Sequence, residues 1–190
     1  LIDRMTLKYV VDFFYFKLID FPIFNVADIY VTCAAFAMIA LGLFYYKDED
    51  IEKLLEKPRP KDSFVEWRTW AIVNTILATG ARAQTICDMR IDDVDFQKKE
   101  IALGHTKNKK AQNVPLSKSL ETCLREYMRK FSISSYLFPN IGDEQLTTNG
   151  LRLAYGRYCS SREVEQTNIH GLRHSFARSW IKNGGSAFAL

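Results

Sequence analysis

The chain has 190 residues, of which 47% are apolar and 25% are charged, and its formal net charge is +4. This composition excludes a disordered tail, a collagen-like repeat and a disulfide-bonded scaffold. Residues 1–46 carry three basic and four acidic side chains, whereas residues 47–190 carry 23 basic and 18 acidic ones. We therefore expect two parts, a membrane-like segment over 1–46 and a mildly basic domain over 47–190.

The first predicted element is an apolar helix over residues 29–46. This run of 18 residues contains no charged side chain, and its length just reaches that of a membrane span. No basic region precedes the run, so a signal peptide is not expected. The run predicts membrane association through residues 29–46, and a buried core helix is the alternative.

Two carboxylates border apolar stretches in this first part. Asp12 follows Val10 and Val11, and Asp28 stands directly before the apolar run. Paired aspartates can share a proton and activate water, although carboxylates at the edge of an apolar stretch are also common without such a role.

The sequence around these aspartates resembles a known family. The matching stretches are LIDRMTLKYVVDFF at residues 1–14 and FPIFNVADIYV at residues 21–31. They resemble the C-terminal part of the lipoprotein signal peptidase (signal peptidase II) family, a membrane aspartyl peptidase. The resemblance implies Asp12 and Asp28 as the catalytic aspartates, with Asn25 beside them. Because that family's earlier spans are missing, we expect a remnant.

The second part begins with helical patterns. Residues 47–57 have acidic residues first and lysines last, which favours a short helix that the following prolines end. Ser63 is expected to cap a longer helix over 64–80, whose apolar residues surround it and predict a central, buried position. Gly80 is expected to end this helix, and a short helix follows over 83–90.

From Val94 onward the pattern changes to that of strands. Two strands are predicted over 95–105 and 111–117, joined by the lysine-rich turn 106–110. Helices are predicted over 119–130 and 146–162, with a short buried strand or loop over 136–140.

The last predicted helix covers residues 169–183. Asn168 is expected to cap it and two glycines to end it. Its core-facing residues are expected to be Ile169, Leu172, Phe176 and Trp180. The predicted fold is therefore mainly α with a small antiparallel β-sheet, preceded by a transmembrane-like helix.

Four side chains of the second part could act on a phosphate group, namely Arg82, Lys107, His170 and Arg173. Two arginines can clamp phosphate oxygens, a histidine can exchange a proton with a nucleophile, and a turn lysine can protonate a leaving oxygen. Each also has an ordinary alternative as a capping, solvated or surface-paired residue, and their spacing alone leaves the choice open. The four cysteines are dispersed without a CxxC pair, so we expect a reducing compartment and no metal or other cofactor.

The local sequence around these residues resembles a second family. The matching stretches are TGARAQTICDMRIDDVDF (79–96), TKNKKAQNVPLSKSL (106–120), LTTNGLRLAYGRY (146–158) and IHGLRHSFARSWIKNGG (169–185). They resemble the catalytic domain of tyrosine recombinases, the phage integrase family, and the HxLRH element at 170–174 is the most specific part.

The resemblance implies site-specific DNA cleavage and rejoining through a 3′-phosphotyrosine, without ATP or metal. It implies that Arg82 is the first catalytic arginine, that Lys107 donates a proton to the 5′-hydroxyl, and that His170 and Arg173 form the HxxR pair. His174 is expected to have a structural or supporting role.

Three departures from this family stand out. Thr85 occupies a position where many relatives have an acidic residue. The resemblance implies that the family's late His/Trp position and its nucleophilic tyrosine lie beyond Leu190, and Tyr155 and Tyr158 are expected to be packing residues. The family's DNA-clamping N-terminal domain is replaced by the membrane-like segment. We therefore expect a fragment, from a natural fusion or an assembly chimera, that does not cleave DNA as given.

Double-stranded DNA is the expected partner of the second part. Lys109 and Lys110 lie in a basic stretch that predicts salt-dependent, largely sequence-independent affinity. An ordinary solvated face, or a DNA-binding module without chemistry, are the alternatives. By the family resemblance the full-length protein is expected to form a homo-oligomer on DNA. The expected location is the cytoplasm for 47–190, or the inner membrane if 1–46 inserts.

Overall fold

The computed structural model describes residues 30–31, 33, 46–104, 112–165 and 168–185. The chain divides into two compact units, Leu1–Phe44 and Tyr45–Leu190. In the first unit the described residues Tyr30, Val31 and Cys33 are helical and exposed. Asp12, Asp28 and most of the predicted span over 29–46 lie outside the described residues.

Among the residues that the structure describes, no helix combines the length and apolar character needed to cross a bilayer. Tyr46, the last residue of the predicted span, lies in the core of the second unit, where only 2% of its surface is exposed.

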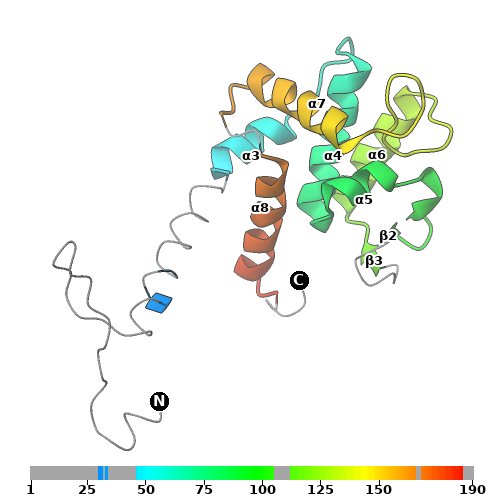
Figure 1. The fold of residues 1–190 in the computed structure, drawn as a ribbon. Coiled ribbons are helices and arrows are strands. Elements are labelled where there is room, and N and C mark those ends of the chain that lie inside the picture. Colours follow the sequence, from blue (N-terminus) through cyan, green and yellow to red (C-terminus); the bar gives the residue numbers. More distant parts are fainter. Residues whose placement is uncertain (1–29, 32, 34–45, 105–111, 166–167, 186–190) are drawn as a thin grey trace, which may run out of the picture. The chain divides into compact units, whose positions relative to one another are not determined.

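The second unit is mainly helical and contains one small sheet (Figure 1). A 3-10 turn over Ile91–Asp93 leads into the sheet. The described helices are α3 (Asp48–Leu55), α4 (Phe64–Thr79), α5 (Ala83–Asp88), α6 (Lys118–Lys130), α7 (Thr148–Ser161) and α8 (Ile169–Lys182). The described strands are β1 (Val94–Asp95), β2 (Glu100–Leu103) and β3 (Gln112–Pro115). The predicted mainly helical fold with a small antiparallel sheet is confirmed.

Helix α4 forms the centre of this unit. It packs against α3, α6, α7 and α8, and buried residues lie all around it, as its apolar composition predicted. The hydroxyl of Ser63 accepts a hydrogen bond from the backbone N–H of Glu66 at 3.3 Å, so the predicted cap is confirmed. The helix ends at Gly80, which has a left-handed backbone (φ 65°).

The sheet is antiparallel with strand order β1-β2-β3, and Ile101 pairs with Val94 on one side and Val114 on the other. The prediction of one continuous strand over 95–105 is wrong, because a tight turn divides it. The Asp95 carboxylate accepts hydrogen bonds from the backbone N–H groups of Gln97 and Lys98, both at 2.9 Å, and Lys99 has a positive φ of 55°. A local side-chain cap of this kind favours a turn over a strand.

Helix α8 follows its predicted core pattern only in its first half. Ile169 and Leu172 are buried, whereas 41% of Trp180 is exposed. Phe176 lies against Gly80, the residue that follows α4, and Trp180 lies one turn further along α8. Both side chains line a cavity, so this end of α8 borders the cavity and not the core.

Candidate functional site

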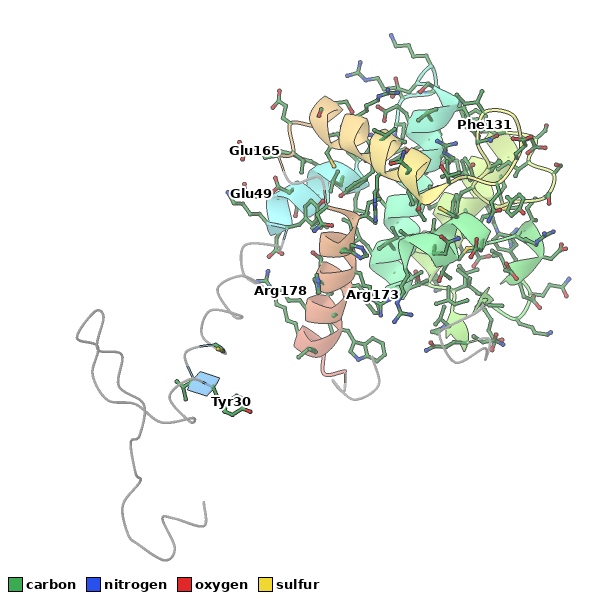
Figure 2. The ribbon with its side chains drawn as sticks, in the orientation of Figure 1. Tyr30, Glu49, Phe131, Glu165, Arg173 and Arg178 are labelled. Atoms are coloured by element: carbon green, nitrogen blue, oxygen red, sulfur yellow. The ribbon has the colours of Figure 1, made fainter. Side chains whose placement is uncertain are left out.

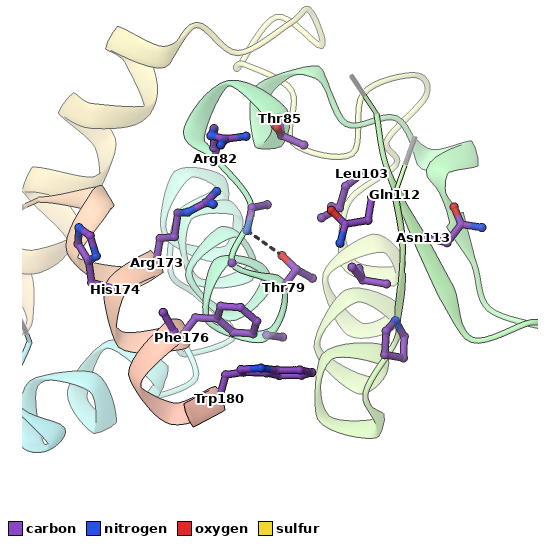
Figure 3. Close-up of a pocket in the computed structure, with 16 residues that line it drawn as sticks. Thr79, Arg82, Thr85, Leu103, Gln112, Asn113, Arg173, His174, Phe176 and Trp180 are labelled. Carbon is purple, nitrogen blue, oxygen red and sulfur yellow. Dashed lines mark hydrogen bonds between the residues drawn. The ribbon is translucent and has the colours of Figure 1, made fainter. Parts of the chain in front are cut away.

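A cavity of about 640 Å³ lies where the turn after α4, strands β2 and β3, and one face of α8 meet (Figure 3). None of the described residues that line it is an aspartate or glutamate. Its polar lining is formed by Thr79, Arg82, Thr85, Gln112, Asn113, Arg173 and His174. Its apolar lining includes Leu103, Val114, Phe176 and Trp180.

Arg82 enters the cavity from the turn between α4 and α5. The left-handed Gly80 turns the chain, and the Thr79 hydroxyl accepts a hydrogen bond from the backbone N–H of Ala81 at 3.2 Å. The same hydroxyl donates to the carbonyl of Thr75 at 2.6 Å. This short, fixed turn places Arg82 at the residue that precedes α5.

Arg173 reaches the same cavity from α8. Phe176, one turn further along α8, packs so closely on Gly80 that a Cβ atom there would lie 2.4 Å from its Cδ1. Glycine is the residue that permits this approach, since it has no Cβ and tolerates a positive φ. Docking of α8 on Gly80 thus brings Arg173 beside the turn that carries Arg82, and Figure 3 shows both guanidinium groups at one side of the cavity.

The two arginines form a concentration of positive charge. Burial lowers the pKa of Arg173, and the nearby positive charge of Arg82 lowers it further. Among the described residues, neither arginine forms an ion pair with a carboxylate. Two guanidinium groups that both carry positive charge repel each other, and an anion between them removes this repulsion. An anion with several oxygens, such as a phosphate, can accept hydrogen bonds from both groups.

The two histidines of α8 differ in their exposure and in their relation to the cavity. His174, predicted as a supporting residue, lines the cavity, whereas His170 is exposed and is not part of the described lining. His170 lies one turn closer to the start of α8, where its backbone N–H donates to the side chain of Asn168 at 3.0 Å. That hydrogen bond confirms Asn168 as the cap of α8.

Three predicted site residues, Lys107, Lys109 and Lys110, lie outside the described residues. Conversely, the structure adds lining residues that the sequence did not single out, namely Gln112 and Asn113 of β3 and Trp180 of α8. Gln112 and Asn113 stand shortly after the lysine-rich turn, separated from it by Ala111, and this proximity to the predicted Lys107 is the sequence signal that could have identified them.

Two family models match the chain in adjoining regions. The phage integrase family matches residues 45–189, and signal peptidase (SPase) II matches residues 1–44.

Curated relatives and solved structures resemble the second region. The tyrosine recombinase XerA of Pyrococcus furiosus is 29% identical over 141 residues, which cover 72% of this chain and 48% of that protein. A probable integrase/recombinase of Acholeplasma phage L2 is 27% identical and covers 74% of this chain and 49% of that protein. The crystal structure of XerA recombinase has a TM-score of 0.62 at 24% identity and covers 75% of this chain and 50% of that one.

The structure of XerH site-specific recombinase bound to its difH substrate has a TM-score of 0.60 at 25% identity, over 74% of this chain and 44% of that one. The chain thus spans about half the length of the curated relatives it matches.

Proposed function

Because the chain belongs to the phage integrase family over residues 45–189, we propose that residues 47–190 are the catalytic domain of a site-specific recombinase. Such an enzyme cuts and rejoins double-stranded DNA through a 3′-phosphotyrosine. The observation that carries the proposal is the pair formed by Arg82 and Arg173, which enter one cavity from two separate elements and face no carboxylate among its described lining residues.

In this proposal the two arginines bind the non-bridging oxygens of one DNA phosphodiester. They neutralise the charge that accumulates on those oxygens as a tyrosine oxygen bonds to phosphorus and the bond to the 5′-oxygen breaks. Lys107 protonates the departing 5′-oxygen, and His170 exchanges a proton with the attacking hydroxyl. His174 has a supporting role, and no metal or cofactor takes part.

The nucleophile is not assigned among the described residues, since no tyrosine is part of the described cavity lining. Tyr155 and Tyr158 lie in the core, where burial raises the pKa of both hydroxyls and so opposes formation of a phenolate. This placement agrees with their expected packing role.

The proposed partner is double-stranded DNA, to which the protein binds as a homo-oligomer in the cytoplasm. Similar structures support this proposal, since they include XerH bound to difH substrate and a lambda integrase tetramer bound to a Holliday junction. Lys109 and Lys110 are proposed to contact the DNA backbone beside the cavity.

The proposal predicts that Arg82 and Arg173 contribute to DNA affinity far more than an exposed arginine of α8 outside the cavity. We expect Arg82→Ala and Arg173→Ala each to weaken binding of a short duplex by about tenfold or more, since a charge-assisted hydrogen bond contributes about 1.5–3 kcal/mol. Fluorescence anisotropy at constant ionic strength measures the affinity.

Arg178→Ala is the matched control. Arg178 belongs to α8, is exposed and lies outside the cavity, with a guanidinium nitrogen 4.0 Å from a carboxylate oxygen of Asp48. Its removal changes the net charge by the same amount, and we expect less than about a twofold effect, because exposed charge pairs contribute little. Equal losses in the Arg173 and Arg178 variants would point to a general basic surface and contradict a phosphate site.

For residues 1–44 we propose an inactive segment related to signal peptidase II, which the family match over that region supports. Asp12 and Asp28 would correspond to the catalytic pair of that family. Cleavage of a prolipoprotein in detergent extracts, abolished by Asp28→Asn, would show instead that the peptidase is active.

A further inference from the structure

Two buried tyrosine hydroxyls form a chain of hydrogen bonds that ends at the start of α8. The hydroxyl of Tyr155, in α7, donates to the hydroxyl of Tyr46 at 2.7 Å. The Tyr46 hydroxyl donates in turn to the backbone carbonyl of Asn168 at 3.1 Å. Tyr46 thus connects the beginning of the unit to a residue 122 positions away.

The accepting residue is the cap of the helix that carries the arginine. The backbone carbonyl of Asn168 also accepts a hydrogen bond from the backbone N–H of Gly171 at 2.9 Å. The side-chain oxygen of Asn168 accepts a hydrogen bond from the backbone N–H of His170. Hydrogen bonds at a helix cap fix the direction in which the first turn leaves the preceding chain. The Tyr46 hydroxyl therefore donates to the same backbone carbonyl of Asn168 that accepts the first hydrogen bond of α8.

Both tyrosines are shielded from water, with 2% of Tyr46 and 1% of Tyr155 exposed. Burial raises the pKa of both hydroxyls, so each keeps its proton, and its ability to donate, throughout the neutral range. Phenylalanine would fill the same space, which makes the hydroxyl groups separable from the packing of the rings.

We propose that Tyr46 and Tyr155 are positioning residues for the phosphate site, because they hold the first turn of α8 and thereby the location of Arg173. This role rests on the proposed function for its ligand, a DNA phosphodiester. Neither tyrosine lies among the described residues of the cavity, so both act through α8.

Arg173 lies between two contacts that hold α8, so its location depends on both of them. The Asn168 cap holds α8 before Arg173, and the contact of Phe176 with Gly80 holds it after. Arg173 is five residues from the cap, about 7.5 Å along the helix at 1.5 Å per residue. If the first anchor loosens, α8 can pivot about the second, and Arg173 moves relative to Arg82. Hydrogen bonds to a phosphate weaken steeply with such misalignment.

The chain offers a closely matched control in Tyr158. It belongs to the same helix α7, 2% of it is exposed, and its hydroxyl donates to the carbonyl of Leu54 at 2.8 Å. Tyr158→Phe removes a buried hydrogen bond of the same kind from the same helix, but that bond ends on α3 and not on α8.

The experiment compares Tyr46→Phe, Tyr155→Phe and Tyr158→Phe in the full chain, at a temperature where all three are folded. Duplex DNA affinity is measured together with hydrogen exchange of the Gly171 amide and the NMR signal of the Arg173 Nε–H. Tyr46→Phe removes two hydrogen bonds, the one donated to Asn168 and the one accepted from Tyr155, and only the first ends on α8. We expect it to weaken DNA binding about five- to tenfold, since loss of the one buried hydrogen bond that holds α8 corresponds to about one factor of ten. We also expect faster exchange at Gly171 and a shifted Arg173 signal.

Tyr155→Phe keeps the bond from Tyr46 to Asn168, so a smaller effect in the same direction is expected. Tyr158→Phe should leave all three readouts as in the wild type. Unchanged affinity and exchange in Tyr46→Phe, or an equal loss in Tyr158→Phe, would overturn the positioning role while the proposed function stands. If the wild type itself does not bind DNA, the proposed function fails, and the Gly171 exchange and Arg173 signal still decide whether Tyr46 holds α8.

Discussion

The thiols of Cys87, Cys123 and Cys159 lie in the core of the second unit. Burial raises the pKa of the Cys123 thiol to about 12, and that of Cys87 and Cys159 to about 11. These groups are neutral in the folded protein at a pH where an unfolded chain already loses their protons. A thiolate is the reactive form of cysteine, so all three are expected to be inert toward thiol reagents until the unit unfolds.

The raised thiol pKa values predict a loss of stability in alkali. A thiol with a raised pKa in the folded state binds its proton more tightly there than in the unfolded chain, and this difference stabilises the folded state. The stabilisation is fully present below the ordinary thiol pKa of about 9 and is lost as the pH rises through the folded-state pKa of about 11. We expect the urea midpoint to be constant from neutral pH to about pH 8.5 and to fall above it.

Cys123→Ala separates the thiol from the tyrosines that titrate at higher pH. The substitution lowers stability at all pH values by creating a cavity, but it should make the decline between about pH 8.5 and 10 shallower. An unchanged slope in this variant would show that the Cys123 thiol does not cause the alkaline loss.

At the scale of elements, the contact between α8 and the end of α4 assembles the site. Gly80 has a left-handed backbone and receives the ring of Phe176, so Gly80→Ala introduces both backbone strain and a steric clash. We expect a loss of about 2–5 kcal/mol in the free energy of unfolding, from about 1–2 kcal/mol for the backbone and about 1–3 kcal/mol for overpacking. Urea denaturation measures it.

The same substitution should weaken DNA binding, since it separates Arg173 from Arg82. In the double variant Gly80→Ala, Phe176→Ala the clash is absent, and part of the DNA affinity should return although stability stays low. DNA affinity that falls in strict proportion to stability, without this recovery, would mean that the contact serves the fold alone.

Elements with a local signal were predictable from the sequence. Ser63 and Asn168 are small polar residues that stand directly before apolar helical patterns, and both cap a helix in the structure. Gly80 ends α4 because few other residues accept a left-handed backbone there.

The remaining differences arise from contacts that hydrophobic periodicity does not reveal, one of them local and the others tertiary. Asp95 captures two backbone N–H groups and divides a strand that looked continuous. Trp180 follows the core periodicity of α8, yet it is 41% exposed and lines the cavity. Arg82 and Arg173 were predicted to meet, whereas Gln112 and Asn113 line the same space and were missed, although they stand close behind the lysine-rich turn.

At the scale of the whole molecule, DNA affinity is expected to depend on both the cavity and the surface. Each phosphate contact that is lost should reduce the slope of log affinity against log salt by about 0.9 for duplex DNA. We therefore expect Arg173→Ala to reduce the slope by about one, and the double variant Lys109→Ala, Lys110→Ala to reduce it by about two.

A competition titration with inorganic sulfate distinguishes the two contributions. Sulfate is expected to displace DNA from the cavity equally well in the wild type and in the lysine double variant. The Arg173→Ala variant is expected to be insensitive to sulfate at the same ionic strength. Loss of sulfate sensitivity in the lysine variant would place the anion at the turn and not in the cavity.

The hydroxyl of Tyr46 has a practical consequence for where this domain can be cut. A shortened protein that starts at Asp48 would retain all the described helices and strands of the second unit. It would nevertheless lack the phenol that bonds to Asn168, and the Tyr155 hydroxyl would lose its acceptor. Such a truncated protein is expected to keep the fold of the second unit but to hold α8 less firmly. The smallest functional piece is therefore expected to begin ahead of α3, at or before Tyr46.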